Sequence, residues 1–222
     1  MIDEELRTIV KVFATYFTLL PVSVGLYKFR FLQRAEKIFL VYLSYGFFTD
    51  FTSMTLRGNF LDVSWIIYNL FSLAEPFFLS LYFYTVAPVP WMKKLNVWFM
   101  ILLVPLWLAF HVEVLGNVRV VGKLSGGFAA GYQVIFAFLS AYFLLMMTQR
   151  KSDMVRSSLF WFVTSIFFSC FCSFFLNTFL ETVYQKHVWI VISFVNIISY
   201  LMTAYAFLIS KKRDDDIPEY SR

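Results

Sequence analysis

The sequence predicts an all-α membrane protein: a polytopic bundle of seven transmembrane helices, with the N-terminus outside and the C-terminus in the cytoplasm. Of the 222 residues, 60% are hydrophobic and only 15% are charged, and the mean hydropathy is +0.70. A soluble domain carries about 25% charged residues. The apolar residues also form blocks long enough to cross a hydrocarbon core of about 30 Å. Basic residues lie mainly in alternate connections between these blocks.

Seven apolar blocks take up nearly the whole chain, because a helix that rises about 1.5 Å per residue needs about 20 residues to cross a bilayer. No segment remains that could fold as a separate soluble domain. Residues 1–210 are therefore predicted to form one seven-helix domain, and residues 211–222 a short charged cytoplasmic tail. The spans are expected at about 6–26, 38–56, 64–85, 95–112, 127–148, 158–179 and 188–210.

The first block follows an acidic start that contains Asp3, Glu4 and Glu5. A cleavable secretory signal begins with positive charge instead, so this block is expected to be retained as a helix. Pro21 should kink it, because proline lacks a backbone donor and clashes with the preceding turn.

The other six blocks each carry a distinguishing feature. Asp50 lies in the second half of the second block, Glu75 and Pro76 lie near the middle of the third, and Pro105 lies inside the fourth. The fifth begins with glycine and alanine, which let helices approach closely. The sixth is rich in aromatic residues, and the seventh carries polar residues at helical spacing.

The orientation follows from the basic residues. Of the 19 Lys and Arg residues, 13 lie in the connections after the first, third and fifth spans or in the C-terminal tail. Cytoplasmic connections carry the excess of Lys and Arg in membrane proteins. This bias places the tail in the cytoplasm and, with seven spans, the N-terminus outside.

Several functions are disfavoured by the residues present. The net charge of +5 comes from basic residues beside apolar spans, where they contact lipid headgroups, so a nucleic-acid partner is not expected. Cys170 and Cys172 are two residues apart and cannot face each other on a helix. His111 and His187 are isolated, so neither a metal site nor a cofactor is expected, and the pattern favours a protein that is not an enzyme.

Glu75 is the strongest candidate for a functional residue. A carboxylate near the bilayer midplane is expensive, and no basic residue lies at a comparable depth in any span. Glu75 is therefore expected to be neutral where water is excluded, or charged if it faces a wet cavity. It either binds a ligand or proton, or holds helices together through hydrogen bonds.

Two further sets of polar residues are candidate ligand contacts. Asn69 and Ser72 precede Glu75 at intervals of three and should wind along one slowly drifting helix face. Asp50 either shares a hydrogen bond with Asn69 or is solvated near the interface. In the last span, Asn196 and Tyr200 belong to a polar stripe that either packs against other helices or lines a ligand site; the stripe also includes Ser193 and Thr203.

Three segments resemble uncharacterised bacterial seven-helix membrane proteins that are similar to the N-terminal sensor modules of histidine kinases. They are NLFSLAE, which contains Asn69 and Glu75, LFWFVTSIFF in the sixth span, and FVNIISYLMTAYAF around Asn196. The resemblance implies a sensor in the bacterial inner membrane. In such sensors a kinase domain follows the last helix, whereas here only about twelve residues follow it, so a separate cytoplasmic signalling partner is expected.

The leading functional hypothesis is thus a non-enzymatic sensor or partner-binding module in the lipid bilayer, which responds to a small or apolar ligand, a proton or a lipid. One alternative is a small proton-coupled secondary transporter or channel, with Glu75 as the coupling carboxylate. Another alternative is a structural subunit of a larger membrane complex.

Overall fold

The computed structural model describes residues 2–56, 61–116, 126–149, 154–179 and 185–210. Within these residues the regular structure is entirely helical, as predicted. The chain divides into two compact units. Unit 1 comprises Met1–Phe29 and Gly126–Ser210, and unit 2 comprises Arg30–Ser125 and Lys211–Arg222. The single domain expected over residues 1–210 stays a prediction, and the predicted tail, residues 211–222, lies outside the described residues.

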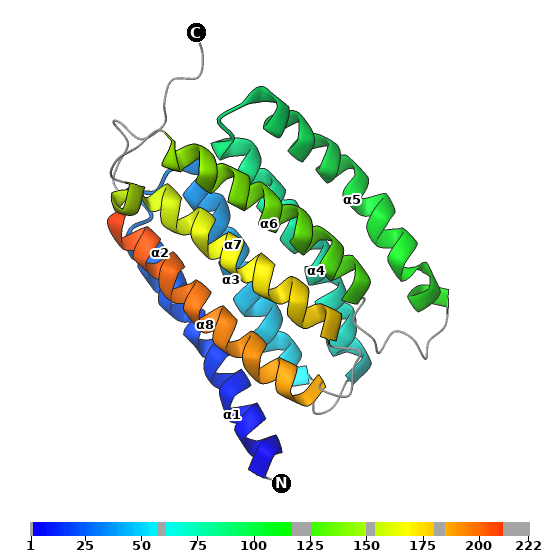
Figure 1. Cartoon of the computed structure of the whole chain (residues 1–222). Coiled ribbons are helices and arrows are strands. Elements are labelled where there is room, and N and C mark those ends of the chain that lie inside the picture. Colours follow the sequence, from blue (N-terminus) through cyan, green and yellow to red (C-terminus); the bar gives the residue numbers. More distant parts are fainter. Residues whose placement is uncertain (1, 57–60, 117–125, 150–153, 180–184, 211–222) are drawn as a thin grey trace. The chain divides into compact units, whose positions relative to one another are not determined.

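Unit 1 contains α1 (Ile2–Phe17), α2 (Leu19–Tyr27), α6 (Gly126–Thr148), α7 (Ser158–Phe179) and α8 (Gln185–Ile209), with the short 3-10 helix η1 (Met154–Arg156) before α7. α8 packs against α1 and α2 on one side and against α7 on the other, and α7 packs against α6. α8 runs in the same direction as α1 and α2, whereas α7 runs in the opposite direction (Figure 1). The start of α1 and the end of α8 therefore lie at opposite ends of unit 1.

The first predicted span is divided into α1 and α2 at Thr18. Pro21 has no amide hydrogen to donate to the carbonyl of Phe17, so the helix ladder is interrupted one turn before the proline. At the break, the Thr18 amide donates to the Thr15 carbonyl at 3.3 Å, and the Thr18 hydroxyl donates to the Ala14 carbonyl at 3.5 Å. Thr18 keeps helical dihedral angles, with φ −60° and ψ −25°. The break therefore interrupts the hydrogen bonding, while the backbone at Thr18 stays in a helical conformation.

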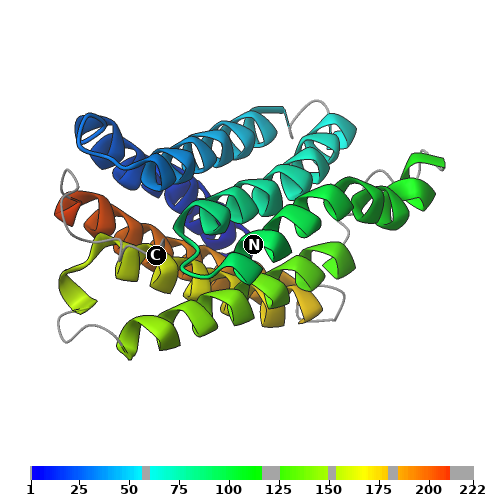
Figure 2. The same cartoon turned by 90° about the horizontal axis from the view of Figure 1, so that it is seen from above.

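Unit 2 contains α3 (Arg34–Leu56), α4 (Leu61–Val86) and α5 (Pro90–Gly116). α4 packs against both α3 and α5, and the three helices lie in a row when the molecule is seen from above (Figure 2). The N-terminus of α3 is capped by Glu36, whose carboxylate accepts a 2.8 Å hydrogen bond from the backbone amide of Gln33. Pro90 opens α5, at the position where its missing amide hydrogen costs nothing.

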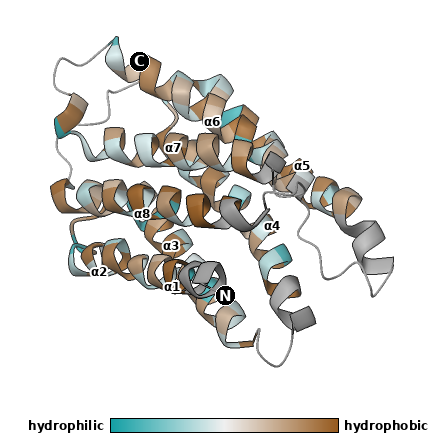
Figure 3. Cartoon of the chain, turned by 60° about the horizontal axis from the view of Figure 1, so that its bottom comes forward, coloured by the Kyte–Doolittle hydropathy of each residue, from teal (hydrophilic) through white to brown (hydrophobic). Residues whose placement is uncertain are grey.

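Six described helices are long and apolar enough to cross a membrane. They are Ile9–Tyr27, Ile66–Val86, Pro90–Phe110, Gly127–Thr148, Ser158–Leu176 and Ile190–Ile209. Hydrophobic turns recur along the helices of both units (Figure 3). This composition is typical of a membrane protein.

The predicted second span coincides with α3 but is not among these six. Its apolar sequence is interrupted by Asp50 and by several Ser and Thr side chains, which lower its hydropathy. The helix itself is confirmed. The seventh crossing of the membrane stays a prediction.

Candidate functional site on α4

Glu75 forms a hydrogen bond to a neighbouring helix. Tyr42 Oη on α3 donates to Glu75 Oε1 at 2.9 Å, and both side chains are half-buried. Glu75 lies directly before Pro76 inside α4. Because proline has no amide hydrogen, Pro76 leaves the carbonyl of Ser72 without its usual helical donor. The middle of α4 therefore concentrates polar atoms in an apolar helix.

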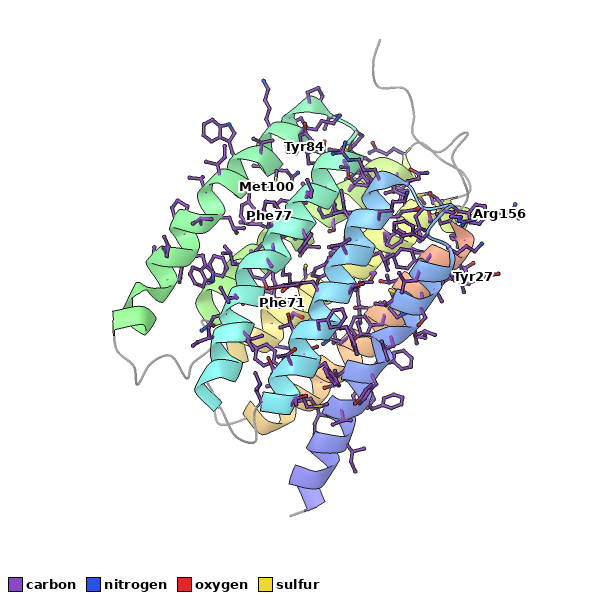
Figure 4. The ribbon with its side chains drawn as sticks, turned by 180° about the vertical axis from the view of Figure 1, so that it is seen from behind. Tyr27, Phe71, Phe77, Tyr84, Met100 and Arg156 are labelled. Atoms are coloured by element: carbon purple, nitrogen blue, oxygen red, sulfur yellow. The ribbon has the colours of Figure 1, made fainter. Side chains whose placement is uncertain are left out.

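Tyr42 also belongs to a closed circuit of four aromatic rings in contact, which we call the four-ring cluster: Tyr42 and Tyr45 on α3, and Phe71 and Phe78 on α4. The centroid of Phe71 lies 6.2 Å from that of Tyr42 and 5.8 Å from that of Tyr45, and the centroid of Phe78 lies 6.3 Å from each tyrosine. Figure 4 shows Phe71 extending from α4. Gly46 of α3 lies beside this ring: a Cβ there would be 3.5 Å from the end of the Phe71 ring, an ordinary van der Waals distance.

Asn69 and Ser72 contact the other neighbour of α4. Trp107 Nε1 on α5 donates to the Asn69 main-chain oxygen at 3.1 Å and to Ser72 Oγ at 3.2 Å. Ser72 Oγ also donates to the Asn69 main-chain oxygen at 2.7 Å. The side-chain oxygen of Asn69 is buried, and among the described residues it has no hydrogen-bond partner. Burying an amide oxygen in this way is costly.

The three predicted residues of α4 thus serve two different contacts. Successive residues of a helix are rotated by about 100°, so each step of three residues lags a full turn by about 60°. Two such steps put Glu75 about 120° from Asn69 around the helix axis. This rotation is large enough for Glu75 to reach α3 while Ser72 and Asn69 reach α5. The rotation predicted along this helix face therefore lets the three residues contact both neighbours of α4, α3 through Glu75 and α5 through Ser72 and Asn69.

The other predicted residues lie elsewhere. Asp50 is half-buried on α3, in unit 2, and its hydrogen bond to Asn69 stays a prediction. Asn196 and Tyr200 are half-buried on α8, in unit 1. The structure therefore brings Glu75, Ser72 and Asn69 together on one helix of unit 2, whereas their joint action with Asn196 and Tyr200 stays a prediction.

The polar stripe of α8 is in part a packing seam. Ser165 on α7 lies with its hydroxyl 2.8 Å from that of Thr203 on α8, and both hydroxyls lie within hydrogen-bonding distance of the Ser199 main-chain oxygen, at 2.9 and 2.8 Å. Ser165 and Thr203 are buried. The packing interpretation of Thr203 is therefore supported by a direct contact to α7.

Four residues that the sequence did not single out complete these contacts: Tyr42, Trp107, Ser165 and Ser199. Signals for them do exist in the sequence. A Tyr hydroxyl or Trp N–H inside a span needs a hydrogen-bond partner, and small residues four apart, such as Ser199 and Thr203, are typical of close helix contacts. Neither signal says which helix supplies the partner.

The described residues contain no group of three or more His, Cys, Asp or Glu side chains that could hold a metal ion. No protein-family model matches the sequence, and no curated protein or solved structure is detectably similar to the chain. The resemblance to sensor modules therefore stays a prediction. What the middle of α4 offers chemically is a carboxylate and a tyrosine hydroxyl at the contact with α3, and a serine hydroxyl and a buried amide oxygen near the contact with α5.

Proposed function

We propose that this chain is a non-enzymatic integral membrane protein that acts as a sensor or partner-binding module, with Glu75 as the residue through which a ligand or proton acts. The observation that carries the proposal is the 2.9 Å contact between Tyr42 and Glu75. A neutral Gln could join two helices as well, since interhelical hydrogen bonds are worth about 0.6 kcal/mol. An acidic residue at the centre of a span costs about 3 kcal/mol on insertion scales. A carboxylate kept at that cost indicates a function beyond packing.

The contact joins α3 to α4, so a ligand or proton that changes the charge of Glu75 changes how these helices are held together. α3 begins at Arg34, directly after the basic connection that contains Lys28 and Arg30. Movement of α3 is therefore passed to this connection, where a cytoplasmic signalling partner binds. The resemblance to histidine-kinase sensor modules supports this function, a location in the bacterial inner membrane, and ligand contacts at Asn69 and Asn196.

The proposed topology has seven spans, with α3 crossing the bilayer, the N-terminus outside and the C-terminus in the cytoplasm. Two observations support it. α3 is a 23-residue helix, long enough to cross at about 1.5 Å per residue. The start of α1 and the end of α8 lie at opposite ends of unit 1 (Figure 1), as an odd number of crossings requires.

We expect Tyr27→Cys and Thr55→Cys to be labelled from opposite sides of the membrane. Both side chains are exposed, and they lie near the inner end of α2 and the outer end of α3 in the proposed topology. The measurement is labelling of intact cells with an impermeant maleimide, in a chain whose Cys170 and Cys172 are replaced by Ala. If α3 did not cross, both new cysteines would react from the same side, and the seven-span topology would be wrong.

We expect Glu75→Gln to change the amount of a stoichiometric cytoplasmic partner that co-purifies with the tagged full chain by about tenfold, the effect of about 1.4 kcal/mol on an equilibrium. The substitution removes the charge and keeps the shape. Asp50→Asn is the matched control. Asp50 and Glu75 are the two acidic residues within the spans predicted at 38–56 and 64–85. Removing the charge of Asp50 should leave the amount of co-purified partner unchanged. Equal recovery from wild type and Glu75→Gln, with normal insertion of both, contradicts the proposed role.

The same variants separate the alternatives. A proton-coupled transporter or channel is favoured by the absence of any Lys, Arg or His between residues 38 and 56 or between 61 and 86, since a proton can then neutralise Glu75. It requires proton flux in proteoliposomes that Glu75→Gln abolishes. A structural subunit requires a stoichiometric partner whose recovery does not depend on Glu75.

A further inference from the structure

Exposed basic side chains gather at one end of unit 2. α4 lies antiparallel to α3 and α5 and packs against both (Figure 4), so the start of α3, the end of α4 and the start of α5 lie at the same end. Arg30 and Arg34 lie at the start of α3, and both are exposed. Lys93 and Lys94 lie at the start of α5, and both are exposed as well. We call the surface formed by these four cations the basic end of unit 2.

Acidic residues of the same segments do not offset this charge at the surface. Residues 30–37 and 84–94 contain a single acidic residue, Glu36. Its side chain is 5% exposed, and its carboxylate accepts the backbone amide of Gln33 at 2.8 Å. The first turn of α5 contains no acidic residue, although the positive end of a helix dipole favours one. The two lysines therefore add to the positive potential of a helix start, and a bound anion is stabilised by both.

Exposed aromatic rings accompany the four cations. Trp91, at the start of α5, is 49% exposed, and Phe31, between Arg30 and Arg34, is 50% exposed. Tyr84 is exposed near the end of α4, beside the start of α5 (Figure 4). Trp and Tyr are enriched where the hydrocarbon core of a membrane meets the lipid headgroups. These rings therefore indicate that the four cations lie at the depth of the headgroups.

An apolar stripe continues from the basic end along α5. Leu95, Trp98 and Leu102 follow Trp91 at intervals of four, three and four residues, and all four side chains are exposed. Residues at this spacing lie along one face of a helix. An acyl chain can pack along this face when its headgroup lies beside Lys94, whereas a soluble anion makes no use of it. The combination of cations, interfacial rings and an apolar stripe therefore suits a lipid better than a free anion.

We propose that the basic end of unit 2 binds anionic phospholipids of the surrounding bilayer. Arg30, Arg34, Lys93 and Lys94 contact the negative groups of the headgroups, and the exposed face of α5 contacts the acyl chains. Each cation near an anionic membrane surface contributes about fivefold in affinity, the effect of about 1 kcal/mol. The inference goes beyond the proposed function, because it assigns a lipid partner to a surface that does not include Glu75.

The probes are dioleoyl phosphatidylglycerol and dioleoyl phosphatidylcholine, which have the same acyl chains and differ in the net charge of the headgroup. Binding of each lipid to the purified full chain in dodecyl maltoside is measured by native mass spectrometry over a lipid titration. We expect phosphatidylglycerol to bind about tenfold more tightly than phosphatidylcholine. The difference should shrink as the concentration of ammonium acetate is raised, because salt screens exposed charges.

Two double variants test the two parts of the basic end. Lys93→Gln combined with Lys94→Gln should weaken the binding of phosphatidylglycerol by about fivefold or more and leave the binding of phosphatidylcholine nearly unchanged. Arg30→Gln combined with Arg34→Gln should have the same effect. Both results are expected because the substitutions remove charge and keep long polar side chains.

The matched control is Arg119→Gln combined with Lys123→Gln. It removes the same number of positive charges from the connection that is predicted on the other side of the membrane, and it should keep the wild-type preference for phosphatidylglycerol. Trp91→Ala should weaken the binding of both lipids, since its ring contacts the lipid whatever the charge of the headgroup.

The proposal is overturned if the two lipids bind equally, or if both double variants keep the wild-type preference while remaining helical and monodisperse. An equal loss of preference in the control variant shows that the lipid follows net charge alone, and also overturns the site. Displacement of phosphatidylglycerol by millimolar inorganic phosphate shows that the surface binds a soluble anion instead of a lipid. None of these outcomes bears on Glu75, whose role is tested by partner recovery.

Discussion

Replacing Phe207 by alanine is expected to lower the free energy of unfolding by about 3 kcal/mol, near the lower end of the range for buried Phe. Phe207 on α8 and Phe162 on α7 are both 0% exposed, and their rings meet edge to face at 4.9 Å between centroids. Lipid can solvate apolar surface released by unfolding, so the hydrophobic term is smaller than in water. The loss of packing contacts and of the ring pair remains.

The effect can be measured by reversible unfolding of the full chain in mixed micelles of dodecyl maltoside and sodium dodecyl sulfate. Leu208→Ala is the matched control, because Leu208 is the next residue of α8 and is 52% exposed. It should cost less than about 1 kcal/mol. Similar losses for the two variants would show that the α7–α8 contact does not stabilise unit 1 in the way described.

Replacing Ser165 by leucine is expected to cost about 2–4 kcal/mol. Ser165 is 3% exposed and lies between α7 and α8, with its hydroxyl 2.8 Å from that of Thr203. Inserting a larger side chain into such a contact costs about 1–3 kcal/mol. The lost interhelical hydrogen bond adds about 0.6 kcal/mol.

Ser165→Ala separates these two terms, because it removes the hydroxyl without adding volume. It should cost about 0.6 kcal/mol and at most about 1.7 kcal/mol, measured in the same mixed micelles. If Ser165→Leu unfolds no more readily than Ser165→Ala, the helices are not closely packed at this position. The seam would then depend on hydrogen bonding alone.

The positions of the helices could be predicted from the sequence because a bilayer requires long apolar blocks, and these blocks stand out in the chain. The ends were less accurate. α5 begins at Pro90 and α8 at Gln185, before the predicted starts at 95 and 188, because helices extend through the interfacial regions where polar residues are tolerated. The break at Thr18 follows from the missing amide hydrogen of Pro21, so a disturbance of the first helix near this proline could be predicted from the sequence.

The partners of the polar side chains could not be predicted in the same way. The sequence places Asn69, Ser72 and Glu75 on one drifting face, but only the packing of α4 between α3 and α5 decides that Glu75 meets Tyr42 and Ser72 meets Trp107. Spacing fixes the angle between side chains on one helix. It does not fix the rotation of that helix relative to its neighbours.

The composition of α3 has a consequence for how the protein is made. In the proposed seven-span topology, α3 must leave the translocon for lipid although it is not among the six described helices that are apolar enough to cross a membrane. α4 is synthesised directly after it and packs along it, and Tyr42 and Glu75 satisfy each other's polar atoms across the pair. Membrane entry of α3 therefore depends on α4 and favours insertion of the two as a helical hairpin. Glu75 is costly to insert when α4 is alone, and through its hydrogen bond to Tyr42 it helps α3 to enter the membrane.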